Sequence, residues 1–207
     1  MTPGRFIALE GGEGAGKSTQ ARLLVEALRT CGRDVELTRE PGGTSGAEAI
    51  RALLLDGAHD WGSRAEAMLF AAARADHVAQ LIRPALEAGK WVVCDRFLDS
   101  SRAYQGGGGG LDDADVRALH AVGSAGLLPD LTLLLRADPK QVAERLARRQ
   151  GADRIEGKGS DYHARVARAF DDFAAAEPAR FVVVDAGGSV ETTHAAIMDA
   201  VDKAFCE

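Results

Sequence analysis

One glycine-rich stretch, from Gly11 to Thr19, constrains the fold of this chain more than any other part of the sequence. It matches the pattern G-x-x-x-x-G-K-[ST], whose glycines allow backbone N–H groups to turn inward around a row of phosphates. In such a loop Lys17 would reach the outer phosphates of a nucleoside triphosphate, and the Ser18 hydroxyl would bind the Mg²⁺ that travels with them. The predicted site comprises Gly11, Gly12, Glu13, Gly14, Ala15, Gly16, Lys17, Ser18 and Thr19.

The residues on either side of this stretch support the prediction. Phe6–Leu9 is a short apolar run, typical of a buried parallel strand. After the glycines, apolar residues recur at helical spacing, so a helix is expected from about Lys17 to near Gly32. Strand, loop and helix N-terminus therefore follow in the order of a phosphate site, with the helix dipole directed at the anion. An ordinary glycine-rich turn is the alternative interpretation, and it does not require this order.

The rest of the chain alternates predicted strands with predicted helices. Further strands are expected at residues 34–38, 91–94, 131–135 and 181–184. Further helices are expected at residues 44–55, 64–88, 112–125, 162–176 and 190–205, and one more opens at Asp138-Pro139. The alternation predicts an α/β fold in one domain, residues 1–207, with a parallel sheet of five strands covered by helices on both faces. The five glycines at 106–110 are expected to be too flexible for the interior of an element.

The composition argues against several classes of protein. A net charge of −6 does not suit a protein that coats nucleic acid, because no overall basic field would attract a phosphate backbone. We find no leader-like segment and no apolar run of about 18 residues, so no membrane association is expected. The three cysteines lack metal or redox spacing, as in proteins of a reducing compartment. We therefore expect a cytoplasmic protein.

Polar residues follow the predicted strands at the edge of the sheet where ligands of such folds bind. Asp95 comes directly after an apolar strand, which is a usual position for a carboxylate that holds Mg²⁺ directly or through water. The alternative for Asp95 is a helix or turn cap. Arg96 can direct two donors at one phosphate, which a lysine does less well. Arg39 and Glu40 come from the neighbouring strand end.

Five segments in order along the chain resemble the thymidylate kinase family. They are Phe6–Thr19, Arg39–Thr44, Asp95–Phe97, Ala103–Gly106 and Asp153–Glu156. The resemblance implies the P-loop nucleoside monophosphate kinase fold with a short lid at about residues 148–161. It also implies transfer of the γ-phosphoryl of ATP to dTMP with Mg²⁺, and a homodimer. Another nucleoside monophosphate kinase is one alternative, and a regulatory module that binds a nucleoside triphosphate is a second.

The same resemblance implies a set of residues that bind dTMP. They are Glu13, Arg39, Glu40, Phe70, Arg74, Arg96, Ser101, Tyr104 and Gln105. Phe70 and Arg74 lie four residues apart on one helix face and would hold thymine, while Tyr104 would crowd a ribose 2′-hydroxyl. On periodicity alone Phe70 would be a core residue and Arg74 solvated. An ion pair that fixes the turn is an equally open interpretation of Glu40.

The resemblance also implies where the catalytic cations lie. The variable positions of the glycine loop hold no basic residue, so Lys17 is its only cation. Arg96 would grip the acceptor phosphate, and Arg154, supported by Arg149, would close over ATP from the lid. The alternative is a solvated basic loop. The chain departs from the family pattern in Gly108–Gly110, where an arginine is often found, and in Arg136, which replaces an acidic residue.

Overall fold

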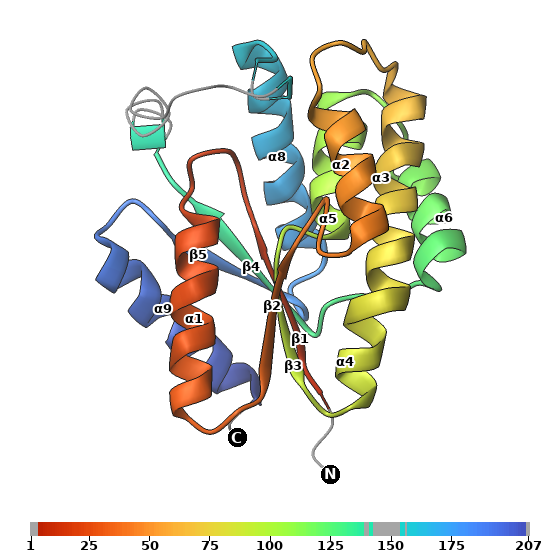
Figure 1. Cartoon of the computed structure of the whole chain (residues 1–207). Coiled ribbons are helices and arrows are strands. Elements are labelled where there is room, and N and C mark those ends of the chain that lie inside the picture. Colours follow the sequence, from red (N-terminus) through yellow and green to blue (C-terminus); the bar gives the residue numbers. More distant parts are fainter. Residues whose placement is uncertain (1–3, 139–140, 143–153, 156, 206–207) are drawn as a thin grey trace.

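Five parallel strands form the centre of the molecule, with the first strand in the middle (Figure 1). The computed structural model describes residues 4–138, 141–142, 154–155 and 157–205. The strands are β1 (Phe6–Glu10), β2 (Val35–Arg39), β3 (Trp91–Asp95), β4 (Leu131–Arg136) and β5 (Phe181–Asp185), and their order in the sheet is β2-β3-β1-β4-β5. The α/β fold with one parallel sheet is thus confirmed. Because every strand points the same way, the polar residues that follow them gather at one edge.

Helices cover both faces of the sheet (Figure 1). One face carries α1 (Lys17–Thr30) and α9 (Val190–Phe205). The other side holds α2 (Ser45–Leu55), α3 (Ser63–His77), α4 (Arg83–Glu87), α5 (Leu98–Ser101), α6 (Asp113–Ser124) and α8 (Ser160–Ala176), together with the π-helical segments η1 (Val78–Ile82) and η2 (Arg102–Gly108). No helix of the described part of the chain is both long enough and apolar enough to span a membrane.

The alternation of side chains along each strand divides the core into two layers. In β1, Ile7 and Leu9 pack toward α1 and α9, whereas Phe6 and Ala8 pack toward the opposite helices. All five residues of β1 are buried. A strand that is apolar on both faces fits only the interior of a covered parallel sheet, which explains the central place of β1.

The predicted helix at 64–88 is three consecutive helical segments, α3, η1 and α4. The middle segment has π-helical hydrogen bonding, and it ends at Ile82, two residues before Pro84. Pro84 lacks the N–H that an uninterrupted α-helix needs. Gly89 follows the last segment with φ +78°, as expected for a glycine beyond a helix end.

The prediction for the glycine run at 106–110 was wrong, because Gly106–Gly108 belong to the helical segment η2. The reason is close packing against α8. A Cβ atom at Gly107 would lie 2.5 Å from the Ala169 Cβ, and one at Gly108 would lie 2.6 Å from the Tyr162 ring. Only residues without a side chain allow these two helices to approach so closely.

Half of the predicted lid at 148–161, namely 148–153 and 156, lies outside the described residues, and this part includes Arg148 and Arg149. Of the helix predicted to open at Asp138, the structure describes Gln141 and Val142, which are helical.

Candidate active site

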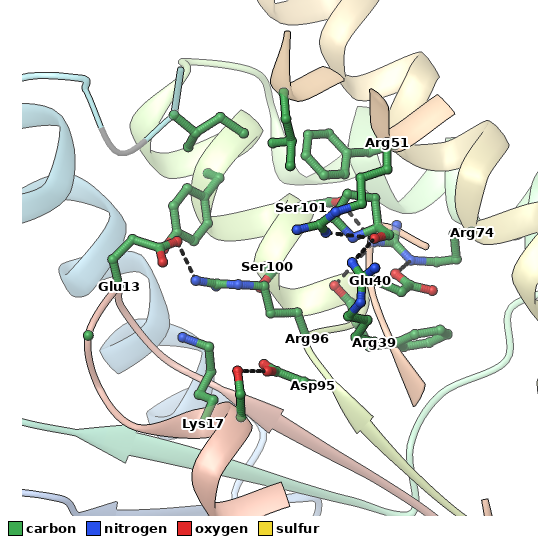
Figure 2. A pocket seen from close by; sticks show the side chains of 18 of the residues that line it. Glu13, Lys17, Arg39, Glu40, Arg51, Arg74, Asp95, Arg96, Ser100 and Ser101 are labelled. Carbon is green, nitrogen blue, oxygen red and sulfur yellow. Dashed lines mark hydrogen bonds and ion pairs between the residues drawn. The ribbon is translucent and has the colours of Figure 1, made fainter. Parts of the chain in front are cut away.

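A cavity of about 480 Å³ opens at the edge of the sheet where the strands end. The residues that line it come from the glycine loop and the first turns of α1, from the ends of β2 and β3, and from helices α2, α3, α5 and η2, together with Ile155 (Figure 2). Every residue predicted for the acceptor lines it: Glu13, Arg39, Glu40, Phe70, Arg74, Arg96, Ser101, Tyr104 and Gln105. The predicted phosphate and metal residues Gly14, Gly16, Lys17, Ser18, Thr19 and Asp95 line it as well.

The glycine loop bends tightly from β1 into α1. At Gly11 φ is +135°, and a Cβ atom there would lie 2.4 Å from the carbonyl oxygen of Leu135. Gly16 caps α1 in the left-handed region with φ +91°. Inside the loop, the Lys17 Nζ donates hydrogen bonds to the carbonyl oxygens of Gly11 at 3.1 Å and Gly12 at 2.7 Å. Burial, helped by nearby Arg96, lowers the pKa of Lys17 to about 8.

Ser18 and Asp95, the two predicted metal ligands, lie side by side at the start of α1 and the end of β3. The Ser18 Oγ donates a short hydrogen bond to the Asp95 Oδ2. The other carboxylate oxygen, Oδ1, is buried and has no hydrogen-bond partner within the described part of the chain. A hydroxyl and a carboxylate with an unused buried oxygen are ligands of the kind that Mg²⁺ prefers.

Arg96 is held from several sides in the centre of the cavity (Figure 2). Its Nη1 donates to the Gly11 carbonyl and to the Ser100 Oγ, both at 3.1 Å, and its Nη2 pairs with Glu13. The guanidinium lies over the Tyr104 ring at 5.1 Å, and the Tyr104 hydroxyl donates to Glu13 at 3.2 Å. The backbone φ angle of Arg96 is +70°, an unfavourable conformation for a residue with a side chain. Such strain persists only where surrounding contacts enforce it, and it is concentrated at functional sites.

Glu10 enforces the turn that carries Arg96. Its carboxylate is completely buried and accepts hydrogen bonds from the backbone N–H of Phe97 at 2.8 Å and of Ser100 at 3.0 Å. Burial, reinforced by the nearby charge of Asp99, raises the pKa of Glu10 to about 7. From the sequence, Glu10 is one of the polar residues at the strand ends that should converge, but no part in holding this turn could be assigned to it. Its signal was a carboxylate at the end of an otherwise apolar strand.

Arg74 is fixed at the far end of the cavity by three hydrogen bonds. Its Nε donates to the Glu40 Oε2 at 2.7 Å, and its Nη2 donates to the Phe97 carbonyl at 3.1 Å and to the Ser101 Oγ at 2.9 Å. Arg74 is only 3% exposed, so the alternative of a solvated arginine was wrong. Phe70 is partly buried and lines the cavity.

Glu40 and Arg39 make separate ion pairs. Glu40 is paired, but with Arg74 rather than within its own turn. Arg39 instead forms two hydrogen bonds with the Glu48 carboxylate, at 2.9 and 3.0 Å. Glu48 also accepts a hydrogen bond from the Gly43 N–H, and this bond is the main cause of its lowered pKa. Glu48 therefore holds the turn after β2, and the Glu40 side chain is buried and pairs with Arg74.

Gln105 and Arg154 share a partner that the sequence did not reveal, the buried Glu66. The Gln105 Nε2 donates to Glu66 at 2.8 Å, and the Gln105 Oε1 has no hydrogen-bond partner among the described residues. Arg154 pairs with Glu66 and donates to the Leu54 carbonyl at 3.2 Å. Burial by itself would raise the pKa of Glu66, but the hydrogen bonds from Gln105 and Arg154 outweigh it and lower the pKa. Arg154 is thus held by Glu66 and Leu54 and does not itself line the cavity.

Arg51 is a second residue that sequence reasoning missed. It lines the cavity from α2 and donates to the Pro41 carbonyl at 2.8 Å (Figure 2). An arginine on an amphipathic helix ordinarily faces solvent, so the sequence carried no signal that would have singled it out.

Comparisons with known proteins match nearly the whole chain to one family. A family model described as thymidylate kinase matches residues 9–197. A thymidylate kinase of Rhizorhabdus wittichii is 60% identical over 202 residues, covering 96% of this chain and 97% of that protein. One from Gluconobacter oxydans is 52% identical over 206 residues, covering 98% and 96%. A crystal structure of thymidylate kinase from Ehrlichia chaffeensis superposes with a TM-score of 0.80 at 32% identity, covering 96% of this chain and all of that one.

Proposed function

The chain belongs to the thymidylate kinase family, and from this premise we propose how its cavity carries out the reaction. It transfers the γ-phosphoryl of ATP to dTMP and yields dTDP and ADP for nucleotide synthesis. The observation that carries the proposed mechanism is one continuous cavity, lined at one end by the glycine loop and at the other by the buried Arg74. Donor and acceptor phosphates can meet between these two ends.

The donor end binds the phosphates of ATP with the glycine loop and Lys17. Ser18 and Asp95 would hold Mg²⁺, which would supply positive charge to the phosphates of ATP when it is bound. Lys17 donates hydrogen bonds to loop carbonyls, and its ammonium group can turn to the incoming phosphates. The loop N–H groups and the N-terminus of α1 add fixed partial positive charge.

The acceptor phosphate binds next to Arg96, with Arg39 nearby. A phosphate monoester has a second pKa of about 6, so dTMP is already an anionic nucleophile near neutral pH and needs no general base. The work of the site is to bring two anions into line and to spread the charge of the transition state. Lys17 and Arg96 both line the cavity and serve this purpose.

The base end of the cavity recognises thymine by hydrogen bonds and stacking. Arg74 offers guanidinium N–H groups to a carbonyl oxygen of thymine, and Phe70 stacks on the ring. Because the Gln105 N–H₂ group is directed at Glu66, its Oε1 is the atom left for the ring N–H of thymine. Cytosine has no ring N–H at that position, so this arrangement selects against it. Tyr104, with Glu13 and Ser101, borders the sugar and crowds a ribose 2′-hydroxyl.

Arg154 acts from the lid, with Arg149 in support. Its side chain pairs with Glu66 beside the cavity, and its neighbour Ile155 lines the cavity. A rotation of the Arg154 side chain away from Glu66 would bring its charge toward the phosphates of ATP. Lys158, whose Nζ is 3.4 Å from the Glu66 carboxylate, can keep that carboxylate paired meanwhile.

The protein works as a homodimer in the cytoplasm. Helix α3 exposes Met68, and the neighbouring helices α2 and α6 expose Leu53 and Val122, the last of which is 89% exposed. These apolar side chains are available for a contact between two identical copies.

A single assay tests the proposed function. ADP release is measured with ATP, Mg²⁺ and each of dTMP, dUMP, dCMP, AMP and GMP, and also without acceptor. We expect release with dTMP, slower release with dUMP, and background with the others. Release that does not depend on any acceptor would favour a regulatory nucleotide-binding module, and a preference for another monophosphate would favour a different kinase of this class.

A further inference from the structure

A buried histidine behind the cavity connects the end of β2 with Arg74. His77 lies on α3, three residues after Arg74, and has no exposed surface. Its Nδ1 lies 3.1 Å from the Glu40 Oε1, and its Nε2 lies 2.7 Å from the Thr38 Oγ1. The second oxygen of Glu40 accepts the hydrogen bond from Arg74. The four side chains form one chain, Thr38–His77–Glu40–Arg74.

The chemistry of the partners assigns the protons of this chain. The Glu40 carboxylate accepts from Arg74, so the ring nitrogen beside its other oxygen must donate, which places the ring proton on Nδ1. In a neutral ring Nε2 is then an acceptor, and it accepts a hydrogen bond from the Thr38 hydroxyl. Every polar atom of His77 is thereby satisfied in one tautomer.

The turn after β2 is shaped around this histidine. A Cβ atom at Gly43 would lie 2.6 Å from the His77 Nε2 and 2.5 Å from the Thr38 Oγ1, and φ at Gly43 is +90°. Only glycine fits both the space and the backbone conformation. The double-glycine turn therefore covers the His77–Thr38 contact directly, as well as bordering the acceptor site.

Glu40 needs both of its partners to stay in place. It is 5% exposed, and a carboxylate with two oxygens can rotate about its last side-chain bond unless both are engaged. Arg74 holds one oxygen and His77 holds the other. If the carboxylate rotated, the Arg74 Nε would lose its acceptor and the guanidinium would lose one of the three contacts that direct it into the cavity.

We propose that His77 is a positioning residue for thymine recognition, which acts on the substrate through Glu40 and Arg74. This inference rests on the proposed function, because it assumes that Arg74 binds the base of dTMP. Of the two ring nitrogens, Nδ1 is the essential one, because it contacts Glu40 whereas Nε2 contacts Thr38. His77 would then set the affinity for dTMP and leave ATP binding and the transfer step unaffected.

Two amide substitutions separate the roles of the two ring nitrogens. In His77→Asn, the side-chain amide nitrogen takes the place of Nδ1 and can still donate to Glu40. In His77→Gln, the amide takes the place of Nε2 and reaches Thr38 instead. A hydrogen bond to a charged group contributes enough for us to expect His77→Gln to raise the KM for dTMP about tenfold or more. We expect His77→Asn to stay within about threefold of the wild type, with kcat and the KM for ATP within about twofold in both.

The matched controls are the same two substitutions at His59, which is exposed, and they should change nothing. Equal effects of Asn and Gln at position 77, or a loss of kcat as large as the rise in KM, would overturn the proposal and leave His77 as a space-filling residue. Should either variant fail to fold, Thr38→Val tests the same chain from its other end. It should raise the KM for dTMP about threefold without changing kcat, and no change would overturn the proposal.

The inference and the proposed function fail in different ways. If the wild type binds and phosphorylates dTMP but the variants match it, only the role of His77 is wrong. If the wild type does not use dTMP, the assignment of the cavity itself is wrong.

Discussion

At the scale of single residues, Lys17 is buried, and within the described part of the chain its ammonium group donates hydrogen bonds to loop carbonyls only. Since we propose that its charge serves catalysis rather than packing, we expect Lys17→Ala to fold and yet to lose transfer activity by a factor of about 10³ or more. Turnover with dTMP and thermal unfolding measure the two properties separately. Lys203→Ala on the exposed side of α9 is the control. A variant that kept a tenth of wild-type turnover would contradict the assignment of the loop.

Arg74 calls for a gentler substitution than alanine. Removal of its charge would leave the buried Glu40 without its guanidinium partner, which can cost about 3–5 kcal/mol of stability and obscure any effect on binding. Arg74→Lys keeps the charge and loses the planar fork. We expect the KM for dTMP to rise about tenfold while the KM for ATP stays unchanged, as measured by steady-state kinetics. Arg64→Lys, on the exposed side of the same helix, serves as the control, and equal changes in both KM values would remove Arg74 from the acceptor site.

Most residues that line the cavity could be predicted from the sequence, but residues whose importance comes from their buried partners could not. Motif residues such as Arg96 and Gln105 were identified from their order along the chain, and the structure brings them together. Glu66 and His77 were missed because neither lies in a motif. Their importance comes from buried partners more than 30 positions away in the chain, Gln105 and Glu40, and such pairs leave no pattern in one sequence.

At the scale of elements, the glycines of η2 differ in what surrounds them. A Cβ atom at Gly106 would have only the Leu111 carbonyl near it, at 3.5 Å, whereas one at Gly107 would lie 2.5 Å from the Ala169 Cβ. We therefore expect Gly107→Ala to destabilise the protein by about 1–3 kcal/mol. Gly106→Ala should be neutral or stabilise it by up to about 1 kcal/mol, because it restricts the unfolded chain. Urea unfolding of both variants tests this, and equal stabilities would show that η2 and α8 are not in close contact.

The proposed lid gives a second prediction at this scale. Arg154→Ala should lower kcat steeply, since arginines that neutralise phosphoryl-transfer charge contribute about 10³–10⁵ in related enzymes. The Kd for dTMP measured without ATP should change little, because Lys158 remains beside Glu66. Arg168→Ala on the exposed side of α8 is the control. A kcat within threefold of the wild type would rule out a catalytic role for Arg154.

Strands and helices were predictable because their signals are local, and the exceptions were not. The apolar runs of β1 and β4 and the periodicity of α9 are visible in the sequence itself. The helical state of Gly106–Gly108 depends on packing against α8, which lies more than 50 residues later in the chain. This close packing is possible only because the glycines have no side chains. The π-helical hydrogen bonding of η1 and η2 likewise leaves no periodicity that separates it from an α-helix.

At the scale of the whole molecule, the exposed apolar residues of α2, α3 and α6 predict a homodimer. Met68 is 54% exposed in the centre of α3. We expect sedimentation at micromolar concentration to give twice the chain mass of 21.8 kDa, and Met68→Glu to shift the protein toward the monomer, because a buried charge at a contact is unfavourable. Val183→Glu, on β5, should leave the dimer intact. A wild-type monomer under these conditions would exclude the proposed assembly.

The buried pair of Glu40 and Arg74 has a consequence for how this enzyme can evolve. The side chains that we propose for recognition of the base also fill the interior between β2, α3 and α5, so a mutation there should alter substrate choice and folding together. Variants that accept a different base must first gain stability elsewhere to tolerate the change. Broadened specificity should therefore arise through residues such as Phe70 or Arg51, which border the cavity without serving as the central ion pair of its buried wall.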